Sequence, residues 1–337
     1  MTTASMLMNV TTTWSLSTDK MDKDGSGQEK SIKQITADAA KEVRENPAAM
    51  EQALRIMRDW IQHNGDIKNI RLDDSFLLRF LRHKKYSILM AQQTLLKFLS
   101  LRRYYPEIFK NLDCDEPALK DILSNGYIMV SPVRDSKGRR VIVYNISKFN
   151  PSKYNCWDMT RAHVLVYDSL LEDSLDQMCG YVHVGDGSGV TGAHLTTWNP
   201  SDFARLIKWG EQSFPMRHRE FHCVNVPIGL KYVLDFAITT ATPKMAERVN
   251  IYTNMKQLQQ KVNVACLPTT YGGPLKQEDM IKYTAQLLSE QKKRVLGLDD
   301  MELLSTRGII SSRKKNNTQT VNGEIAIQGS FRKLEID

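Results

Sequence analysis

The chain has 337 residues, 41% of them hydrophobic, and carries 46 lysines and arginines against 38 aspartates and glutamates. This length and apolar content exclude a wholly disordered chain and predict either two domains or one large domain with appendages. The net charge of +8 suits an acidic surface, and charge alone does not distinguish a phospholipid headgroup layer from a nucleic acid.

The five cysteines are odd in number, widely spaced and never arranged as CxxC. They argue against a disulfide framework or a zinc knuckle and favour a reducing cytosol. The N-terminus, MTTASMLMNVTTTWSLST, lacks a basic region followed by a continuous apolar stretch, and no window approaches the roughly 18 apolar residues of a membrane span. We therefore expect a cytoplasmic protein whose membrane association is peripheral and transient.

Residues 1–35 are rich in Thr, Ser, Asp, Lys and Gly, and this composition predicts a disordered lead. Over residues 36–110 apolar side chains recur at steps of three and four, which predicts a small helical module. Asp73 and Asp74 are good N-terminal capping residues for SFLLRFLRHKK, whose basic end suits the helix dipole. A further helix, SILMAQQTLLKFLSLRRYY, is expected to end before Pro106.

Residues 115–285 change to an α/β pattern. The runs GYIMVSP, RRVIVYNIS, GYVHVGD and EFHCVNV are typical of strands. The stretches TRAHVLVYDSLLEDSLDQM and PSDFARLIKWGEQSF are helical, and strands separated by such helices predict a largely parallel sheet. Residues 286–337 are expected to form the end of a polar helix and a flexible tail.

Two motif matches compete with plainer explanations. GSGVTG (187–192) fits the G-x-G-x-x-G dinucleotide fingerprint, but AHLTTWNP is expected to intervene before the next helix, so a flexible exit from the strand explains the glycines better. HREFH would place His218, Glu220 and His222 on one face of a strand as a candidate metal site, although surface histidines are the more common case. The sequence contains no HExxH, Walker lysine loop or GxSxG motif, so an enzyme is poorly supported.

Basic residues gather at two places. SFPMRHREFHCVNVP carries Arg217 and Arg219 at the start of a strand, and TPKMAERV carries Lys244 and Arg248 one helical turn apart. If the two clusters converge, they would hold a multiply charged phosphate through charge-assisted hydrogen bonds. Two unrelated solvated patches are the alternative, and periodicity alone leaves both open.

Two segments resemble a known family. DDSFLLRFLRHKKYSILMAQQTLLKFLSLRRYYPEIF resembles the N-terminal helical segment of CRAL-TRIO proteins. The run from GYVHV through SFPMRHREFHCVNVP to LPTTYGGPL resembles their lipid-binding domain and includes its characteristic LPxxYGG. The similarity covers roughly residues 45–290 and is greatest to the alpha-tocopherol transfer and cellular retinaldehyde-binding branches, with PMRHRE similar to the insect members.

The resemblance implies an α/β CRAL-TRIO fold in which a mostly parallel sheet is the floor of a hydrophobic cavity, preceded by a small all-α module. It implies a cytosolic carrier, not an enzyme, that transfers one retinoid, tocopherol or other lipid between membranes. The implied partners are this lipid, phosphatidylinositol phosphates and the membrane surface, with no nucleic acid, cofactor or metal. Four basic residues grip a phosphoinositide headgroup in tocopherol-transfer-like members, and they match Arg217, Arg219, Lys244 and Arg248.

The lid implied by the resemblance is the segment IGLKYVLDFAIT (228–239). Its predicted lid residues are Ile228, Leu230 and Leu234. Its apolar side is expected to include Ile228, Val233, Leu234 and Ala237, with Lys231 and Asp235 on the polar side. The cavity-lining positions carried over from the family are His163, Tyr167, Tyr181, Leu206, Phe214, Phe221, Val233 and Ala237.

Three of these positions, His163, Tyr167 and Tyr181, are polar for a hydrocarbon pocket. The end of the lid, residues 239–241, is small where relatives are bulky. Both departures favour an amphipathic ligand over tocopherol, unless the polar atoms bond one another or water. The rival function is a phosphoinositide-recognising signalling or trafficking adaptor without transfer activity, and a dehydrogenase using GSGVTG ranks third.

Overall fold

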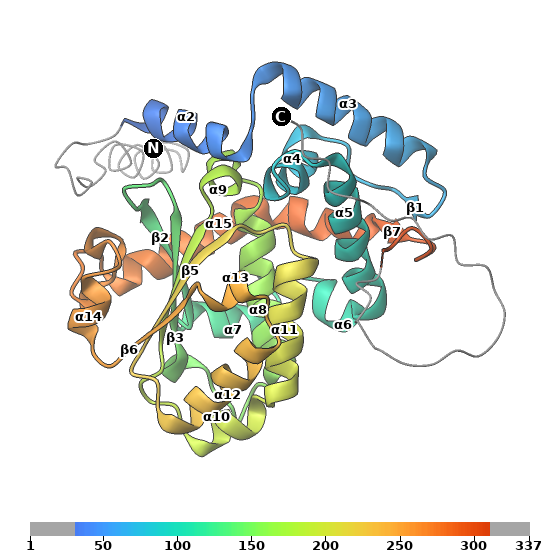
Figure 1. Ribbon diagram of the computed structural model, residues 1–337. Helices are drawn as coiled ribbons and strands as arrows, with labels where there is room; N and C mark the ends of the chain where they lie inside the picture. The colour runs from blue at the N-terminus through green and yellow to red at the C-terminus, as the bar shows by residue number, and fades with distance from the viewer. Residues whose placement is uncertain (1–30, 311–337) are drawn as a thin grey trace, which may run out of the picture.

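The computed structural model describes residues 31–310 (Figure 1). The expected lead up to residue 30 and the expected tail from residue 311 lie outside the described residues. Helix α2 (Ile32–Val43) begins inside the span 1–35, where Ser31 caps it by accepting a hydrogen bond from the Gln34 amide. The prediction of disorder is therefore wrong for residues 32–35.

The N-terminal helices follow their local sequence signals. Asn46 and Pro47 end the first helical region and start the next, since Asn46 accepts from the Ala49 amide and Pro47 occupies the first helical position. Asp73 caps its helix by accepting from the Phe76 amide, as predicted. The helices of this part are α3 (Pro47–His63), α4 (Asp74–His83), α5 (Ile88–Tyr104), α6 (Pro106–Phe109) and α7 (Pro117–Ser124).

The central sheet has five strands in the order β2-β3-β4-β5-β6. Strands β2 and β3 are antiparallel, whereas β3, β4, β5 and β6 are parallel neighbours, so the predicted largely parallel sheet is present. The four expected strands are β2 (Ile128–Arg134), β3 (Arg140–Asn145), β4 (Tyr181–Asp186) and β5 (His218–Val224). Strand β6 (Val249–Tyr252) was not expected, because its four residues follow directly on a helix. A separate pair joins β1 (Ile67–Lys68) to β7 (Glu302–Leu303).

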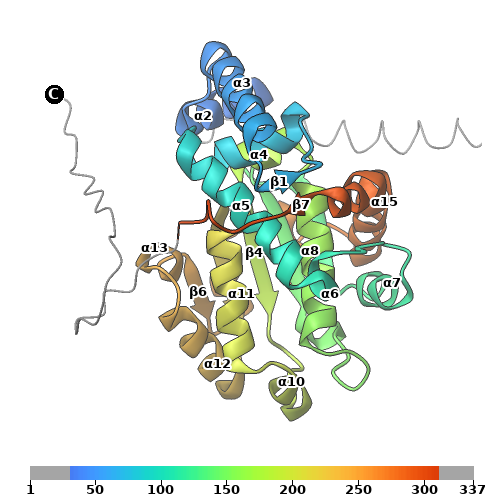
Figure 2. The ribbon, with the colours of Figure 1, turned by 90° about the vertical axis from the view of Figure 1, so that its right-hand side faces the viewer.

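Helices cover both faces of the sheet and one edge (Figures 1 and 2). Figure 1 shows α8 and α11 on one side of the strands and α14 on the other. Helix α15 packs along β2, where the Thr284 hydroxyl accepts from the Val130 amide at 2.9 Å. The remaining helices are α8 (Cys156–Leu170), α9 (Ser174–Cys179), α10 (Gly192–Thr197), α11 (Pro200–Gln212), α12 (Ile228–Thr239), α13 (Pro243–Ala246), α14 (Met255–Gln259) and α15 (Gln277–Leu296).

Successive strand residues feed two separate cores, as the two-residue period of a strand requires. Val130 and Ile142 point into the larger core, under the helices. Met129 and Val143 point into the smaller core, which the LPTTYGG segment closes. A Cβ atom at Gly273 would lie 1.9 Å from the Leu267 carbonyl oxygen, so this motif needs a glycine to turn back on itself.

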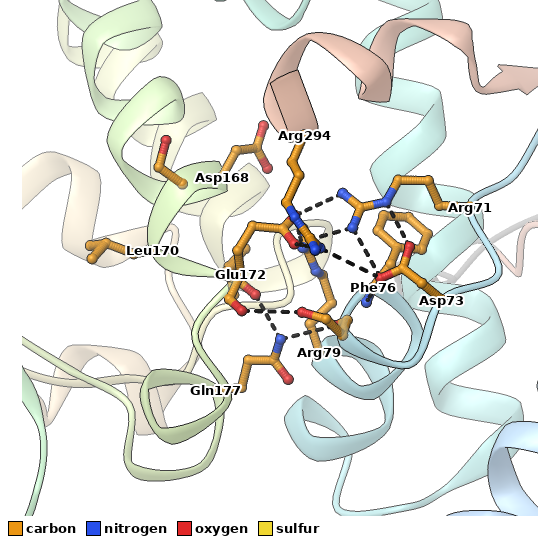
Figure 3. A network of polar contacts seen from close by, with 12 residues as sticks. Arg71, Asp73, Phe76, Arg79, Asp168, Leu170, Glu172, Gln177 and Arg294 are labelled. Carbon is orange, nitrogen blue, oxygen red and sulfur yellow. Dashed lines mark hydrogen bonds and ion pairs between the residues drawn. The ribbon is translucent and has the colours of Figure 1, made fainter. Parts of the chain in front are cut away.

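A buried carboxylate joins the helical module to the sheet domain (Figure 3). The Glu172 side chain is 3% exposed and accepts from Arg71 at 2.7 Å, from Arg79 at 2.6 Å and from Arg294 at 3.0 Å. Burial alone would raise the pKa of Glu172, but the two arginines Arg79 and Arg71 outweigh it and lower that pKa to about 2. Glu172 therefore stays charged and ties α4 and α15 to the corner between α8 and α9.

The same corner corrects one prediction from the sequence. The stretch 160–178 was expected to be a single helix, but it breaks between Leu170 and Ser174. Asp173 restarts the chain as the N-cap of α9 by accepting from the Asp176 amide. At this break the Glu172 side chain points toward Arg71, Arg79 and Arg294. These arginines are distant in the sequence, so no local pattern indicates the break.

Every helix among residues 31–310 is too short or too polar to span a lipid bilayer.

We expect Glu172→Gln to lower the free energy of unfolding by roughly 3 kcal/mol, because it leaves buried Arg79 without its counter-charge. Denaturant unfolding would measure this loss. The matched control is Glu51→Gln on the exposed side of α3, which should stay within about 0.5 kcal/mol of the unsubstituted protein. Equal stabilities of the two variants would contradict the role given to Glu172.

Candidate functional site

A cavity of about 450 Å³ lies among α2, the β2–β3 turn and the start of β5, and we call it the basic cleft. Its charged lining residues are the cations Lys137, Arg139, Arg219 and Arg248 and the acids Asp38, Glu42 and Glu220. The cations outnumber the acids, and arginines can grip carboxylate or phosphate oxygens with paired hydrogen bonds. The cleft is therefore suited to an anion.

Three of the four predicted headgroup residues gather here. Arg219 and Arg248 line the cleft. Arg217 lies behind them, 8% exposed, and donates to the Arg82 carbonyl oxygen at 3.1 Å and to Glu42 at 2.7 Å. Lys244 is exposed on α13 and is not part of the lining. The headgroup assignment of all four residues remains a prediction.

A bulge at the start of β5 sets the position of Arg219. His218 pairs with Tyr181 while Glu220 pairs with Val182, so Arg219 is an extra residue in the ladder. Its Nε donates to the Cys179 carbonyl oxygen at 2.8 Å, which fixes the guanidinium at the end of α9. The bulge and this bond direct Arg219 into the cleft.

Gly180 allows the chain to pass this point. Its φ is +86°, and a Cβ atom would lie 2.4 Å from the Arg217 carbonyl oxygen. Any other residue would push the start of β5 away from the end of α9.

Two groups at the cleft, Glu42 and Arg217, have shifted pKa values and are still ionised at neutral pH. A hydrogen bond from Arg219 lowers the pKa of Glu42 to about 2 despite partial burial. Burial, followed by repulsion from Arg219, lowers the pKa of Arg217 to about 10. Both groups therefore carry full charge near pH 7.

Four charged residues of the cleft lining were not predicted from the sequence: Asp38, Glu42, Lys137 and Arg139. Lys137 and Arg139 belong to DSKGRR, the turn between two predicted strands, and no site was predicted from their charges. Glu42 lies 175 residues from Arg217 in the chain, and no local pattern connects the two.

The alternative metal site is not assembled. His218 bonds His183 at 2.8 Å on the side of the sheet facing α8, and the bulge places Glu220 and His222 on the other side. There Glu220 and His222 bond each other at 3.0 Å. The three side chains therefore do not face a common point.

The glycine run GSGVTG has a packing explanation. A Cβ atom at Gly187 would lie 2.8 Å from the Asn225 carbonyl oxygen, and Gly189 has a φ of +75° beside Ser147. The following segment, expected to have no helix, contains α10, which begins at Gly192 and has six residues. Close backbone approach accounts for Gly187, and a left-handed backbone conformation accounts for Gly189.

The polar side chains predicted near the cavity bond one another in a buried chain. His163 and Tyr167 belong to it, with histidine and tyrosine neighbours on the sheet. The five contacts are Tyr127–His163 at 2.9 Å, His163–Tyr167 at 3.2 Å, Tyr167–Tyr144 at 2.8 Å, Tyr144–His183 at 2.8 Å and His183–His218 at 2.8 Å. Tyr181 is separate and donates to the Leu170 carbonyl oxygen. These atoms are satisfied without a ligand.

A second, apolar cavity of about 80 Å³ lies behind α12. Two of the three predicted lid residues, Leu230 and Leu234, line it. The eight predicted cavity residues are absent from this lining: Val233 and Ala237 are buried on α12, and Phe221 stacks on His183 with ring centroids 4.4 Å apart. The other five are His163, Tyr167, Tyr181, Leu206 and Phe214. Ligand pockets usually measure roughly 300–1,000 Å³, so this cavity must widen to enclose a lipid.

Helix α12 has the bounds of the predicted lid, but one residue faces the other way. Ile228, expected on the inner apolar side, is 71% exposed. It stands in the first turn, before the inward-facing Leu230. Lys231 and Asp235 form an ion pair on the exposed surface of the helix. This agrees with the prediction that they lie on its polar side.

Two family models match the chain. The model described as "CRAL/TRIO domain" matches residues 124–273, and that described as "Pinta-like, UBA domain" matches residues 46–119. Clavesin-1 of Xenopus laevis is 30% identical over 248 residues, covering 73% of this chain and 75% of that protein. The alpha-tocopherol transfer protein-like protein of Homo sapiens is 29% identical over 258 residues, covering 76% of this chain and 75% of that protein. The structure titled "Crystal structure of Sfh5" matches with a TM-score of 0.46 and 14% identity, covering 74% of this chain and 99% of that chain.

Four histidines that are buried or half-buried make the stability of the folded protein depend on pH. Burial lowers the pKa of His163 and of His218 to about 4, and lowers the pKa of His83 and of His183 well below 6.5. As the pH falls below 6.5, the unfolded chain takes up protons that the folded protein does not, so the folded state loses stability.

We expect the free energy of unfolding to decrease between pH 6.5 and pH 4.5, by up to roughly 1.4 kcal/mol per pH unit for each histidine. Denaturant titrations at several pH values would measure it. The carboxylates Glu42, Glu172 and Glu220, each with a pKa of about 2, lose their stabilising effect only below about pH 4.5. Unchanged stability between the two pH values would contradict the neutral buried histidines.

Proposed function

The chain belongs to the CRAL/TRIO family, and from this premise we propose that it is a carrier that encloses one hydrophobic molecule and exchanges it at a membrane surface. The observation that carries the proposal is the two-sided apolar character of α12. Its inner side lines the apolar cavity with Leu230 and Leu234. Its outer side exposes Ile228, Tyr232 and Phe236, which are 71%, 69% and 48% exposed.

The three exposed side chains recur every four residues and so form one stripe along the helix, which we call the outer stripe. A clustered exposed apolar surface marks a contact with a membrane or another protein, and aromatic side chains suit the boundary between water and lipid. A helix that is apolar on both sides can leave its cavity and enter a lipid surface without exposing new apolar area to water. This property suits a lid that opens at a membrane.

The basic cleft supplies the second half of the docking proposal. The guanidinium groups of Arg219 and Arg248 and the ammonium group of Lys137 would bind phosphates of an inositol lipid headgroup. The chain runs from α12 through α13 directly to Arg248, so headgroup binding and lid movement act on neighbouring segments.

The rival proposal is an adaptor that recognises phosphoinositides without transferring lipid, and the small size of the apolar cavity favours it. Mass spectrometry of an organic extract from the purified protein separates the two. A stoichiometric lipid supports the carrier. Folded protein that binds headgroups tightly but contains no lipid supports the adaptor.

Replacing Tyr232 or Phe236 with serine should weaken adsorption to phosphatidylcholine vesicles. Burying a large apolar side chain contributes about 1.5–3 kcal/mol, so we expect a roughly tenfold or larger loss for each substitution. Vesicle co-sedimentation gives the affinity, with Leu89→Ser, an exposed leucine on α5, as the matched control. Equal effects of the three substitutions would contradict docking through the outer stripe.

Replacing Arg219 or Arg248 with glutamine should slow lipid transfer from vesicles that contain phosphatidylinositol bisphosphate by roughly tenfold, since each removes a charge-assisted contact. Transfer of a fluorescent lipid measures the rate, and the lipid content of the purified variants should stay unchanged. Arg55→Gln, at an exposed position of α3, is the control. An unchanged rate in both cleft variants would rule out the headgroup assignment.

A further inference from the structure

Helix α2 contributes part of the wall of the basic cleft. Figure 1 shows this helix next to α9. It rests on α9 through a small apolar cluster in which the buried residues are Ile35, Ala39, Met178 and Cys179. This cluster is separate from the two larger cores of the described chain. The buried residues of α2 are Ile35, Ala39 and Val43, so three side chains supply its buried apolar contacts.

The Glu42 side chain of α2 binds two arginines at the cleft, Arg217 and Arg219. Glu42 accepts from Arg219 with both carboxylate oxygens, each at 2.7 Å, and from Arg217 at 2.7 Å. A paired arrangement on one guanidinium is the geometry by which arginine holds either a carboxylate or a phosphate. The Glu42 carboxylate thus stands where the oxygens of a phosphate would bind the same donors.

The chain following α2 is held more firmly than α2 itself. Glu45 accepts from Arg82 at 2.7 Å and from the Tyr86 hydroxyl at 2.7 Å, and its side chain is 12% exposed. Arg44, between the helix and this anchor, has a positive φ of 64°. A change at this junction would swing α2 away while Glu45 remains bound. Glu42, by contrast, is 42% exposed and within reach of a competing anion.

We propose that α2 is an autoinhibitory latch, in which Glu42 fills the anion position of the basic cleft until a phosphorylated inositol headgroup displaces it. This inference rests on the proposed docking function and adds its regulation. The two states exclude each other, because the donors that Arg217 and Arg219 give to Glu42 cannot at the same time serve a phosphate. The apparent affinity for headgroup is then the intrinsic affinity reduced by the fraction of molecules with the latch open.

The first test compares Glu42→Gln with the unsubstituted protein and with Glu51→Gln, which makes the same charge change at an exposed position of α3. Binding is measured to soluble inositol trisphosphate and to phosphatidylcholine vesicles with and without phosphatidylinositol bisphosphate. We expect Glu42→Gln to bind both phosphorylated probes roughly three- to tenfold more tightly, and Glu51→Gln to match the unsubstituted protein.

The outcomes of this test separate the latch from the docking function. If all three proteins bind the probes with equal affinity, docking stands and the latch is wrong. If none binds, the proposed docking fails and the latch fails with it. If Glu42→Gln gains no more than Glu51→Gln, the gain comes from overall charge, and the latch is again wrong.

The second test needs no substitution and so does not depend on the folding of a variant. Hydrogen exchange of the α2 amides (32–43) is followed in the full-length protein with inositol trisphosphate or with inorganic phosphate at equal concentration. Faster exchange confined to α2 supports its release. Release by inositol trisphosphate alone assigns the latch to headgroups, and release by both keeps the latch but assigns it to phosphate in general. Unchanged or slower exchange in α2 with saturating inositol trisphosphate overturns the proposal.

Discussion

The contact of Glu172 with three arginines positions much of what surrounds the site. It fixes the corner where α8 ends and α9 begins, and Asp173 in that corner caps α9. The far end of α9 presents the Cys179 carbonyl oxygen to Arg219, which turns toward the basic cleft. A buried charge that joins two modules therefore also sets the direction of a guanidinium more than forty residues further along the chain. The cost of burying Glu172 is offset because its arginines come from both modules and leave no carboxylate oxygen unpaired.

The two faces of the central sheet carry different parts of the protein. One face carries the LPTTYGG segment and an apolar core, while the other carries the hydrogen-bonded chain from Tyr127 to His218 and the helices that surround the apolar cavity. The bulge at Arg219 lets β5 contribute to both, since it brings His218 to one face and Glu220 to the other. The candidate site thus depends on a single extra residue in an otherwise regular ladder.

The parts of the fold that depend on local signals could be predicted from the sequence. Asp73 as an N-cap, the end of α5 before Pro106 and four of the five strands of the central sheet follow from short patterns. The break after Leu170 could not be predicted, because its cause is the distant arginines. Glu42 was missed for the same reason. The inward face of α12 was predicted except at Ile228, because the spacing of apolar residues cannot tell one that is buried from one that is exposed.

The chain of histidines and tyrosines couples the direction in which its successive hydrogen bonds donate. It joins six side chains through five hydrogen bonds, and each neutral member has one hydrogen to give. A neutral histidine in the middle of the chain cannot accept at both ring nitrogens, so the order can reverse only at Tyr167 or Tyr144, whose hydroxyl hydrogen would then lie outside the five contacts. If Tyr127 donates to His163 and the order does not reverse, every later member donates onward, and the spare hydrogen lies on Nε2 of His218. If His218 donates instead, again without a reversal, all five bonds run the other way and the spare hydrogen lies on Tyr127, which lines the apolar cavity. Where the order does not reverse, a ligand atom that binds Tyr127 would therefore select the tautomer of His218, whose carbonyl oxygen accepts from Arg248 at the basic cleft.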